Sequence, residues 1–365
     1  MKRWGNLYPR VYDFQNLYEA YRRARIGHRY EPGVLAFTRN LEENLIALQN
    51  ELIWKTYRVG PYREFYIYDP KKRLVAALPF RDRVVQWAVF RVIEPLFDRT
   101  FIRDSYACRV GKGTHAAARR LQYWLRYLTR RHPRVYALHV DISKYFYRID
   151  HAVLKTILRH RIKDKDLLWL LDVIIDSGEF GLPPDAAGFN GPRIPGVGLP
   201  IGNLTSQLFA NIYLDQADQF AKQRLRLRWY MRYMDDILVL HPDKRELRWV
   251  KDELQAFLEE RLRLTVSPKT SIRPISDGID WVGYRIWPTH SLIRRRTKIR
   301  IRRRLAQCRR LYAAGLMPWQ KVRSVVMSYL GHLRHCDSYN LRRKVIATLT
   351  FTKEGLSQSA ARGAQ

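Results

Sequence analysis

Two adjacent aspartates, Asp235 and Asp236, interrupt a strongly apolar stretch of the chain. Burying either carboxylate without compensation would be costly, so the pair must face water, a cation or a metal ion. Adjacent like charges repel unless a positive charge neutralises them, and hard carboxylate oxygens are the ligands that Mg²⁺ selects. An Asp-Asp pair by itself is more often a solvated loop, so a metal site depends on the residues around it.

A third carboxylate, Asp141, stands at the end of a second compact apolar run, residues 135–140. If the two apolar segments are neighbouring strands, three acids meet at strand ends. Such a set can hold two Mg²⁺ ions about 4 Å apart, which stabilises the attacking and leaving oxygens of phosphoryl transfer. The three aspartates therefore predict a two-metal phosphoryl-transfer site.

The elements that must position these acids follow from the spacing of apolar residues. A strand is expected at 134–142 and a hairpin at 229–240, with the two acids in its turn. Asp150 is the expected N-cap of the helix that follows the first strand. Further helices are expected up to about residue 55 and at 81–97 (ending near Pro95), 114–129, 150–162, 203–225 and 246–262; a hairpin at 61–78, a short strand at 281–286 and a Gly/Pro-rich loop at 178–200 complete the pattern.

The charge of the chain restricts its partners. It has 67 Lys and Arg against 34 Asp and Glu, a formal net charge of +33. Such a positive field is typical of proteins that bind nucleic acids or anionic membranes, and a solvated basic surface is the simpler alternative. No apolar run has the length of a membrane span, and the N-terminus lacks a signal-peptide core. We therefore expect a nucleic-acid partner, no membrane and a cytoplasmic location.

The three cysteines, Cys108, Cys308 and Cys336, are far apart and odd in number, so they predict a reducing compartment and no disulfide framework. His332 and His335 precede Cys336 closely. This cluster lacks a second ligand pair at zinc spacing, so we do not predict a zinc site there.

The residues around the three acids resemble the motifs of reverse transcriptases, which occur here in the family's order across 71–286. Residues 233–236 (Tyr-Met-Asp-Asp) resemble the catalytic motif, and 140–146 the first palm motif, continued at 149–151 as in bacterial members. The other matches are the fingers motifs at 71–74 and 82–86, the motif that contacts template and nucleotide at 199–207, the later palm motif at Lys269, and the primer grip of Trp281, Val282, Gly283 and Tyr284.

The resemblance implies a role for each matching position. Asp141, Asp235, Asp236 and the backbone carbonyl of Ile142 would hold two Mg²⁺ ions, with Mn²⁺ as the alternative metal. Phe146 would be the ring that excludes a ribose 2′-OH, although a core aromatic is equally natural at that position. The remaining nucleotide-binding positions would be Arg73 with Lys71 or Lys72 on the triphosphate, Ile201, Gly202 and Gln207 beside the nucleotide, and Lys269 as a proton donor to pyrophosphate; ordinary surface charge is the alternative for these cations.

The implied fold is α+β, a right-hand polymerase of fingers, palm and thumb whose palm has a ferredoxin-like antiparallel sheet. We expect fingers at 1–130, palm at 131–290 with a helical and Gly/Pro-rich insertion near 160–198, a helical basic thumb at 291–350 and a tail at 351–365. The thumb would contact the backbone of an RNA/cDNA duplex without reading its sequence. Its candidate contacts are Arg294, Arg295, Arg296, Lys298, Arg300, Arg302, Arg303 and Arg304.

In the 199–207 motif the sequence differs from most reverse transcriptases and resembles one subfamily. Retroviral and group II intron enzymes usually carry Gln-Gly and Ser-Pro where this chain has Ile201-Gly202 and Ser206-Gln207. This pattern, with 106–109, 113–115 and 285–290, resembles the reverse transcriptases of diversity-generating retroelements of bacteria and their phages. That family implies a template RNA copied into cDNA from dNTPs, errors at adenines and a small basic accessory protein. Because Ile201 cannot form the hydrogen bond of an amide, discrimination between nucleotides would weaken.

Two alternatives remain. A group II intron-like or retron-type reverse transcriptase of ordinary fidelity would share the catalytic motifs. The tail after the thumb is too short for a ribonuclease H, endonuclease or maturase domain, which argues against the intron type. A catalytically silent RNA-binding scaffold is the second alternative, and the presence of all three acids argues against it.

Overall fold

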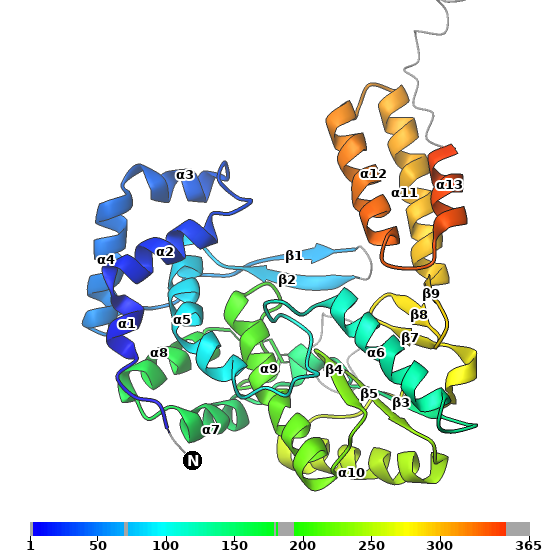
Figure 1. Ribbon diagram of the computed structural model, residues 1–365. Coiled ribbons are helices and arrows are strands. Elements are labelled where there is room, and N and C mark those ends of the chain that lie inside the picture. The colour runs from blue at the N-terminus through cyan, green and yellow to red at the C-terminus, as the bar shows by residue number, and fades with distance from the viewer. Residues whose placement is uncertain (1–2, 69–71, 179, 182–192, 348–365) are drawn as a thin grey trace, which may run out of the picture. The chain divides into compact units, whose positions relative to one another are not determined.

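The computed structural model describes residues 3–68, 72–178, 180–181 and 193–347, shown as coloured ribbon in Figure 1. The chain forms two compact units. The first consists of Met1–Val110, Leu138–Val239 and Arg248–Ser271, and the second of Gly111–Ala137, Leu240–Leu247 and Ile272–Gln365. These two units are the compact parts of the chain and do not test the expected borders of fingers, palm and thumb, which remain predictions.

The N-terminal part of the first unit is helical, as its apolar spacing predicts. Leu45, Leu48 and Leu52 lie on one helix face and are buried, so this helix packs an apolar face against the core. The expected hairpin at 61–78 is also confirmed, with Phe65 opposite Val75. These elements are α1 (Tyr8–Tyr12), α2 (Phe14–Ala24), α3 (Pro32–Arg39), α4 (Leu41–Ile53), β1 (Arg63–Ile67), β2 (Arg73–Ala77) and α5 (Phe80–Asp98).

A four-stranded sheet carries the acids, with its strands in the order β4-β5-β3-β6. Its elements follow one another as strand, helices, two strands, helix and strand, the β-α-β-β-α-β order of a ferredoxin-like sheet. The expected palm sheet is therefore confirmed. Its members are β3 (Tyr136–Asp141), α7 (His151–Arg161), α8 (Lys165–Asp176), α9 (Leu204–Gln219), a π-helical turn (Phe220–Arg224), β4 (Tyr230–Tyr233), β5 (Asp236–His241), α10 (Lys244–Leu262) and β6 (Ser271–Pro274).

The helix after β3 begins where its capping residue predicts. The Asp150 side chain accepts a hydrogen bond from the Val153 backbone N–H at 3.0 Å. This bond satisfies one of the free N–H groups in the first turn of α7. The sequence interpretation of Asp150 as an N-cap is confirmed.

Two expected boundaries were wrong. Helix α5 does not end near Pro95 but continues to Asp98, and the buried Phe97 anchors this last turn in the core. The segment expected as one strand at 281–286 is a hairpin, because Val282 and Gly283 have φ values of 43° and 97°. Such positive φ values turn the chain, which a continuous strand cannot do.

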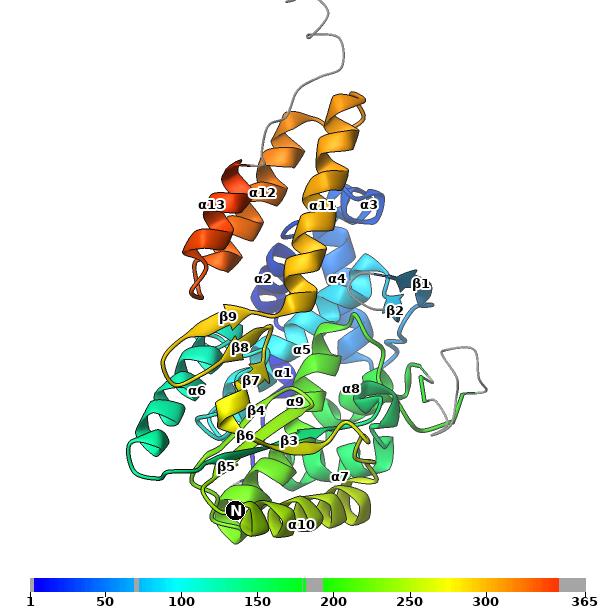
Figure 2. The ribbon, with the colours of Figure 1, turned by 90° about the vertical axis from the view of Figure 1, so that its right-hand side faces the viewer.

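The second unit combines a three-stranded sheet, β7-β8-β9, with helices that expose many basic side chains. Ile301, Leu305, Leu333 and Val345 form a small core among its last helices. Figure 2 shows α11, α12 and α13 side by side. The elements are α6 (Thr114–Thr129), β7 (Ile279–Trp281), β8 (Tyr284–Ile286), β9 (Ser291–Ile293), α11 (Arg295–Ala313), α12 (Trp319–Leu333) and α13 (Tyr339–Ala347).

The three cysteines are free, with Cys308 buried and Cys108 exposed. Among the helices that the structure describes, none is long and apolar enough to cross a membrane.

Candidate active site

The hairpin of β4 and β5 places the two adjacent acids. Tyr233 pairs with Asp236, so Met234 and Asp235 form a two-residue turn. Met234 has a φ of 54°, and two-residue hairpin turns require positive φ because only this conformation matches the twist of the strands. A non-glycine residue in this region is strained, and such strain gathers at functional sites. The predicted turn at the acids is confirmed.

The third acid lies close to this turn. Asp141 ends β3, which is the neighbour of β5 in the sheet. Burial raises the pKa of Asp235 to about 6, and the negative charges of Asp236 and Asp141 add to this increase. The positive charge of Arg73 acts in the opposite direction. The three carboxylates are therefore close enough to repel one another, and a cation among them would offset this repulsion.

The end of β3 is held by the segment that precedes β6. The Asp141 carbonyl accepts a hydrogen bond from the Ser267 N–H at 2.7 Å, and the Asp141 N–H donates to the Thr270 hydroxyl at 3.3 Å. Ile142 forms an antiparallel bridge with Val266. The backbone at Asp141 and Ile142 is thus held in place by residues 266–270.

His139 adds a group that the sequence interpretation did not include. Its Nε2 lies 3.4 Å from Asp236 Oδ1. His139 and Asp141 are two residues apart on β3, so their side chains share one face of the sheet. The only signal in the sequence was this spacing, and it had no meaning before the position of β5 was known.

A buried ion pair connects the β4-β5 hairpin to helix α9. The Arg232 guanidinium on β4 donates to Asp218 of α9 at 2.7 to 2.9 Å, and both side chains are 0% exposed. Arg232 also donates to the Asn211 side-chain oxygen at 3.1 Å and to the Met234 carbonyl at 3.0 Å. Tyr230 donates its hydroxyl to Asp218 at 2.7 Å. The turn that carries Asp235 is therefore fixed to helix α9 through Arg232.

The predicted triphosphate cations lie at the start of β2. Arg73 is exposed, and its positive charge lowers the pKa of Tyr147 against the larger effect of burial. Because Arg73 also acts on Asp235, it belongs to the surroundings of the acids. Lys72 is exposed, with its ammonium 4.3 Å from the centre of the Tyr66 ring. Lys71 lies outside the described residues.

The motif at 199–207 lies against β2 and the loop after β3. The Leu199 N–H donates to the Phe146 carbonyl at 2.7 Å, and the Ala76 N–H of β2 donates to the Ile201 carbonyl at 3.0 Å. Gly202 has a φ of 125°, and a Cβ there would lie 3.0 Å from the Ala76 carbonyl oxygen. Phe146 and Ile201 are half-buried, and Gln207 is exposed on α9. The structure thus brings Phe146, Ile201 and Gly202 together.

The other predicted site residues are Lys269, the predicted primer grip and the predicted thumb cations. Lys269 is exposed, and within the described part of the chain its ammonium forms no ion pair. In the hairpin predicted as the primer grip, which belongs to the second unit, Trp281 and Tyr284 are buried, and Val282 and Gly283 form the turn. Of the predicted thumb contacts, Arg294 lies 3.7 Å from Asp280. The exposed ones are Arg295, Arg296, Arg300, Arg302 and Arg303, and the half-buried ones are Arg294, Lys298 and Arg304.

The donor set suits a hard divalent cation, since it consists of carboxylates that repel one another. Among the residues that the structure describes, no three His, Cys, Asp or Glu side chains are arranged to hold a metal ion. The three carboxylates are therefore the right chemical groups for Mg²⁺. Their side chains in the described residues do not form a complete set of ligands.

A model of the family "Reverse transcriptase (RNA-dependent DNA polymerase)" matches residues 68–286, more than half of the chain. The chain belongs to the reverse transcriptase family. It is therefore an RNA-directed DNA polymerase with the α+β right-hand fold of that family. The match includes all three acids and the hairpin of β7 and β8.

The chain is also similar to curated proteins. It is 27% identical over 309 residues to protein YkfC of Escherichia coli (strain K12), covering 74% of this chain and 77% of YkfC. It is 23% identical over 318 residues to the group II intron-encoded protein LtrA of Lactococcus lactis subsp. cremoris, covering 67% of this chain and 50% of LtrA. The chain thus spans most of YkfC and half of LtrA.

Among solved structures, the telomerase from Candida albicans, in complex with a fragment of telomeric RNA, aligns with 80% of this chain and 56% of its own. The TM-score is 0.48 and the identity 14%. A likeness this weak supports no conclusion about function.

Proposed function

We propose that this reverse transcriptase copies a template RNA into cDNA by two-metal nucleotidyl transfer, with Asp141, Asp235 and Asp236 as the metal ligands. The observation that carries the proposal is the β4-β5 turn, which brings Asp235 and Asp236 beside the acid at the end of β3. Two Mg²⁺ ions, or Mn²⁺ in their place, would supply the positive charge that stabilises the attacking and leaving oxygens. The backbone carbonyl of Ile142 would be a further oxygen ligand.

The incoming dNTP would bind beside β2 and the 199–207 motif, which contact each other. Arg73, with Lys71 or Lys72, would offset the charge of the triphosphate. Phe146 would exclude a ribose 2′-OH, next to Ile201, Gly202 and Gln207. Lys269 would donate a proton to pyrophosphate. The primer-grip residues 281–284 and the basic face of α11 would hold the RNA/cDNA duplex.

RNA-templated incorporation of labelled dNTPs tests this function. With Mg²⁺ and a primed RNA template, the purified chain should make DNA, and ribonuclease treatment of the template should prevent synthesis. Asp141→Asn should lower the rate about a thousandfold or more, because a metal ligand is worth several kcal/mol in the transition state. The matched control is Asp252→Asn, an exposed carboxylate on α10, which should retain the full rate. Absence of RNA-templated product, or normal synthesis by Asp141→Asn, would refute the proposal.

We further propose that the copying is error-prone at template adenines and serves a diversity-generating retroelement in a bacterial or phage-infected cytoplasm. Ile201 supports this, because its backbone is held by β2 while its side chain cannot form a hydrogen bond to a nucleotide. A small basic accessory protein would be a partner of such an enzyme.

Fidelity on a defined RNA template tests the role of Ile201. Ile201→Gln should lower misincorporation at template adenines about tenfold, the factor that about 1.4 kcal/mol of restored discrimination gives. Sequencing of the cDNA measures the error spectrum. Ile46→Gln, at an exposed position of α4, is the control and should leave the spectrum unchanged. An identical spectrum in Ile201→Gln and the unmodified chain would show that Ile201 does not set fidelity.

The second candidate is a group II intron-like or retron-type enzyme of ordinary fidelity, which the similarity to LtrA favours. The same sequencing separates the two. Errors spread evenly over the four template bases at a low rate would favour the second candidate.

A further inference from the structure

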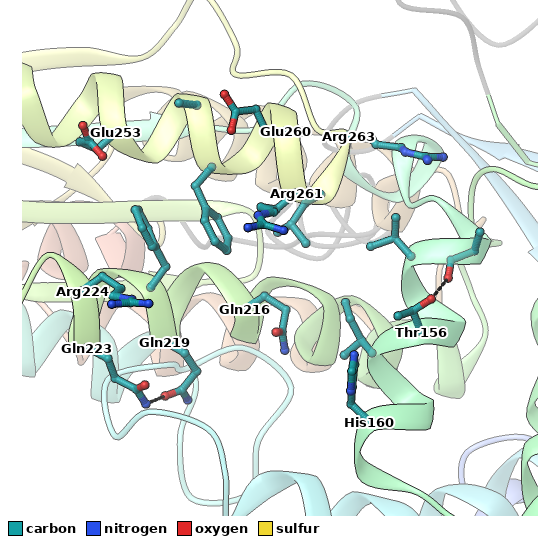
Figure 3. Close-up of a pocket in the computed structure, with 17 residues that line it drawn as sticks. Thr156, His160, Gln216, Gln219, Gln223, Arg224, Glu253, Glu260, Arg261 and Arg263 are labelled. Carbon is teal, nitrogen blue, oxygen red and sulfur yellow. Dashed lines mark hydrogen bonds between the residues drawn. The ribbon is translucent and has the colours of Figure 1, made fainter. Parts of the chain in front are cut away.

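A pocket of about 860 Å³ lies in the first unit between α7, the end of α9 and α10 (Figure 3). Its volume is within the range of pockets that hold small organic ligands. None of the residues with a proposed role in DNA synthesis lines it. The proposed polymerase chemistry therefore leaves this pocket without a function.

Four side chains with hydrogen-bond donors line the pocket without partners of their own. They are His160 from α7, Gln216 and Arg224 from α9 and its π-helical turn, and Arg261 from α10. In the described part of the chain, no hydrogen bond or ion pair occupies these side chains. Unpaired guanidinium groups beside a hollow are a suitable site for phosphate, which they bind through paired N–H donors.

Two aromatic rings share the pocket with these donors. Phe220 and Phe257 stack with their centroids 4.4 Å apart and their planes at 13°. Both rings are half-buried and line the pocket, so part of their apolar surface stays open. In sites for single-stranded RNA, nucleobases stack on exposed aromatic rings of this kind.

The π-helical turn at the end of α9 contributes to this arrangement. Leu225 donates its N–H to the Phe220 carbonyl at 3.1 Å, which widens the turn. Both Phe220 and Arg224, four residues apart, then face the pocket. Such turns are rare, and they occur often at functional sites.

The charges of the pocket favour a nucleotide over a simple anion. Glu253 and Glu260 of α10 also line it, and their carboxylates would repel an isolated phosphate. A nucleotide suits both kinds of group, because its phosphate accepts from Arg224 and Arg261 while base amino groups donate to carboxylates. Gln216 can donate to or accept from the edge of a base.

We propose that this pocket binds one nucleotide of the template RNA, as a second RNA contact outside the catalytic motifs. The inference rests on the proposed function for the identity of the RNA, and its chemistry is that of a phosphorylated nucleoside. Binding there would hold the RNA in a fixed register while the copied segment occupies the catalytic site.

Direct crosslinking tests the location. A single-stranded RNA of about ten nucleotides that contains 4-thiouridine should crosslink, in the full chain, to peptides that include 216–224 or 253–263. Ala256→Trp places a large ring on an exposed lining position and should remove these crosslinks. Crosslinks that persist in Ala256→Trp, or that never form in these peptides, would overturn the proposal.

The affinity for RNA tests whether the two pocket arginines bind phosphate. Arg224→Ala with Arg261→Ala should weaken binding of the same RNA about tenfold by fluorescence anisotropy. The matched control is Arg245→Ala with Arg248→Ala, two exposed arginines of α10 that do not line the pocket. It removes the same net charge, so it should weaken binding about twofold at most, through the long-range field alone. Equal losses in the two double variants would contradict a specific pocket.

Two further arms separate the remaining explanations. If ATP displaces the crosslinked RNA and itself crosslinks to the same peptides more readily, the ligand is a free nucleotide and the RNA proposal fails. Extension of a short pre-annealed primer on RNA should be equal in both double variants. If the unmodified chain extends the primer but forms no crosslinks in these peptides, only the pocket proposal is refuted. If it forms the crosslinks but does not extend the primer, only the polymerase function is refuted.

Discussion

Asparagine at both Asp235 and Asp236 is expected to abolish DNA synthesis without unfolding the protein. The change keeps the size of each side chain and removes two negative charges from a group of three that repel one another. Because the proposed metal ions depend on these charges, the rate should fall more than about a thousandfold. Raising the Mg²⁺ concentration should not restore it, since neutral amides are poor ligands for a hard cation.

The fold should tolerate this change. The hairpin is held by Arg232 and by pairing between β4 and β5, neither of which uses the two carboxylates. Thermal unfolding of the variant should therefore occur at or above the temperature of the unmodified chain. Asp243→Asn with Asp252→Asn, two exposed acids, is the control and should keep full activity. DNA synthesis that survives in the Asp235 and Asp236 variant would disprove the metal assignment.

Asp218→Asn is expected to destabilise the protein by about 3 to 5 kcal/mol, the usual effect of removing one partner from a buried ion pair. Arg232 would remain charged and 0% exposed, and its acceptors Asn211, the Met234 carbonyl and the new amide carry no charge to neutralise it. Activity should fall as well, because Arg232 fixes the turn that carries Asp235. Urea unfolding measures the stability. Unfolding at the same urea concentration as the unmodified chain would show that Arg232 does not need Asp218.

Asp215 lies three residues earlier on α9 and provides the matched control. Its replacement by asparagine should raise the stability of the protein, where that of Asp218 should lower it. Burial raises its pKa to about 7, with the charge of Asp218 as the next cause. The folded state therefore resists ionisation, so the cost is absent below the unfolded pKa of about 3.8, grows as the pH rises and is complete above about 7.

Asp215→Asn removes this cost and should stabilise the protein at pH 8, by at most about 4 kcal/mol. The gain should shrink as the pH falls and disappear near pH 4. Urea unfolding at several pH values measures it. A loss of stability at pH 8 would contradict the assignment of Asp215 as a strained buried acid.

The local elements of this protein were predictable from its sequence, because they depend on short-range patterns. The leucine spacing of α4, the cap of α7 by Asp150 and the Asp-Asp turn between apolar strands each lie within one or two elements. The reverse transcriptase family was predictable as well, since its motifs occur in order along the chain and the family match confirms them. Subtype and fidelity are proposals that depend on a few residues around Ile201.

Only the tertiary structure placed groups that are distant in the sequence. The partners of Arg232 lie on α9, 14 and 21 residues earlier in the chain, and His139 approaches Asp236 only because β5 lies beside β3. The pocket of Figure 3 combines three separate helical segments, so no single motif encodes it. The sequence by itself determined the acids and their turn, because neighbouring residues control local backbone geometry. The groups that surround those acids were decided by packing between elements, which depends on side chains far apart along the chain.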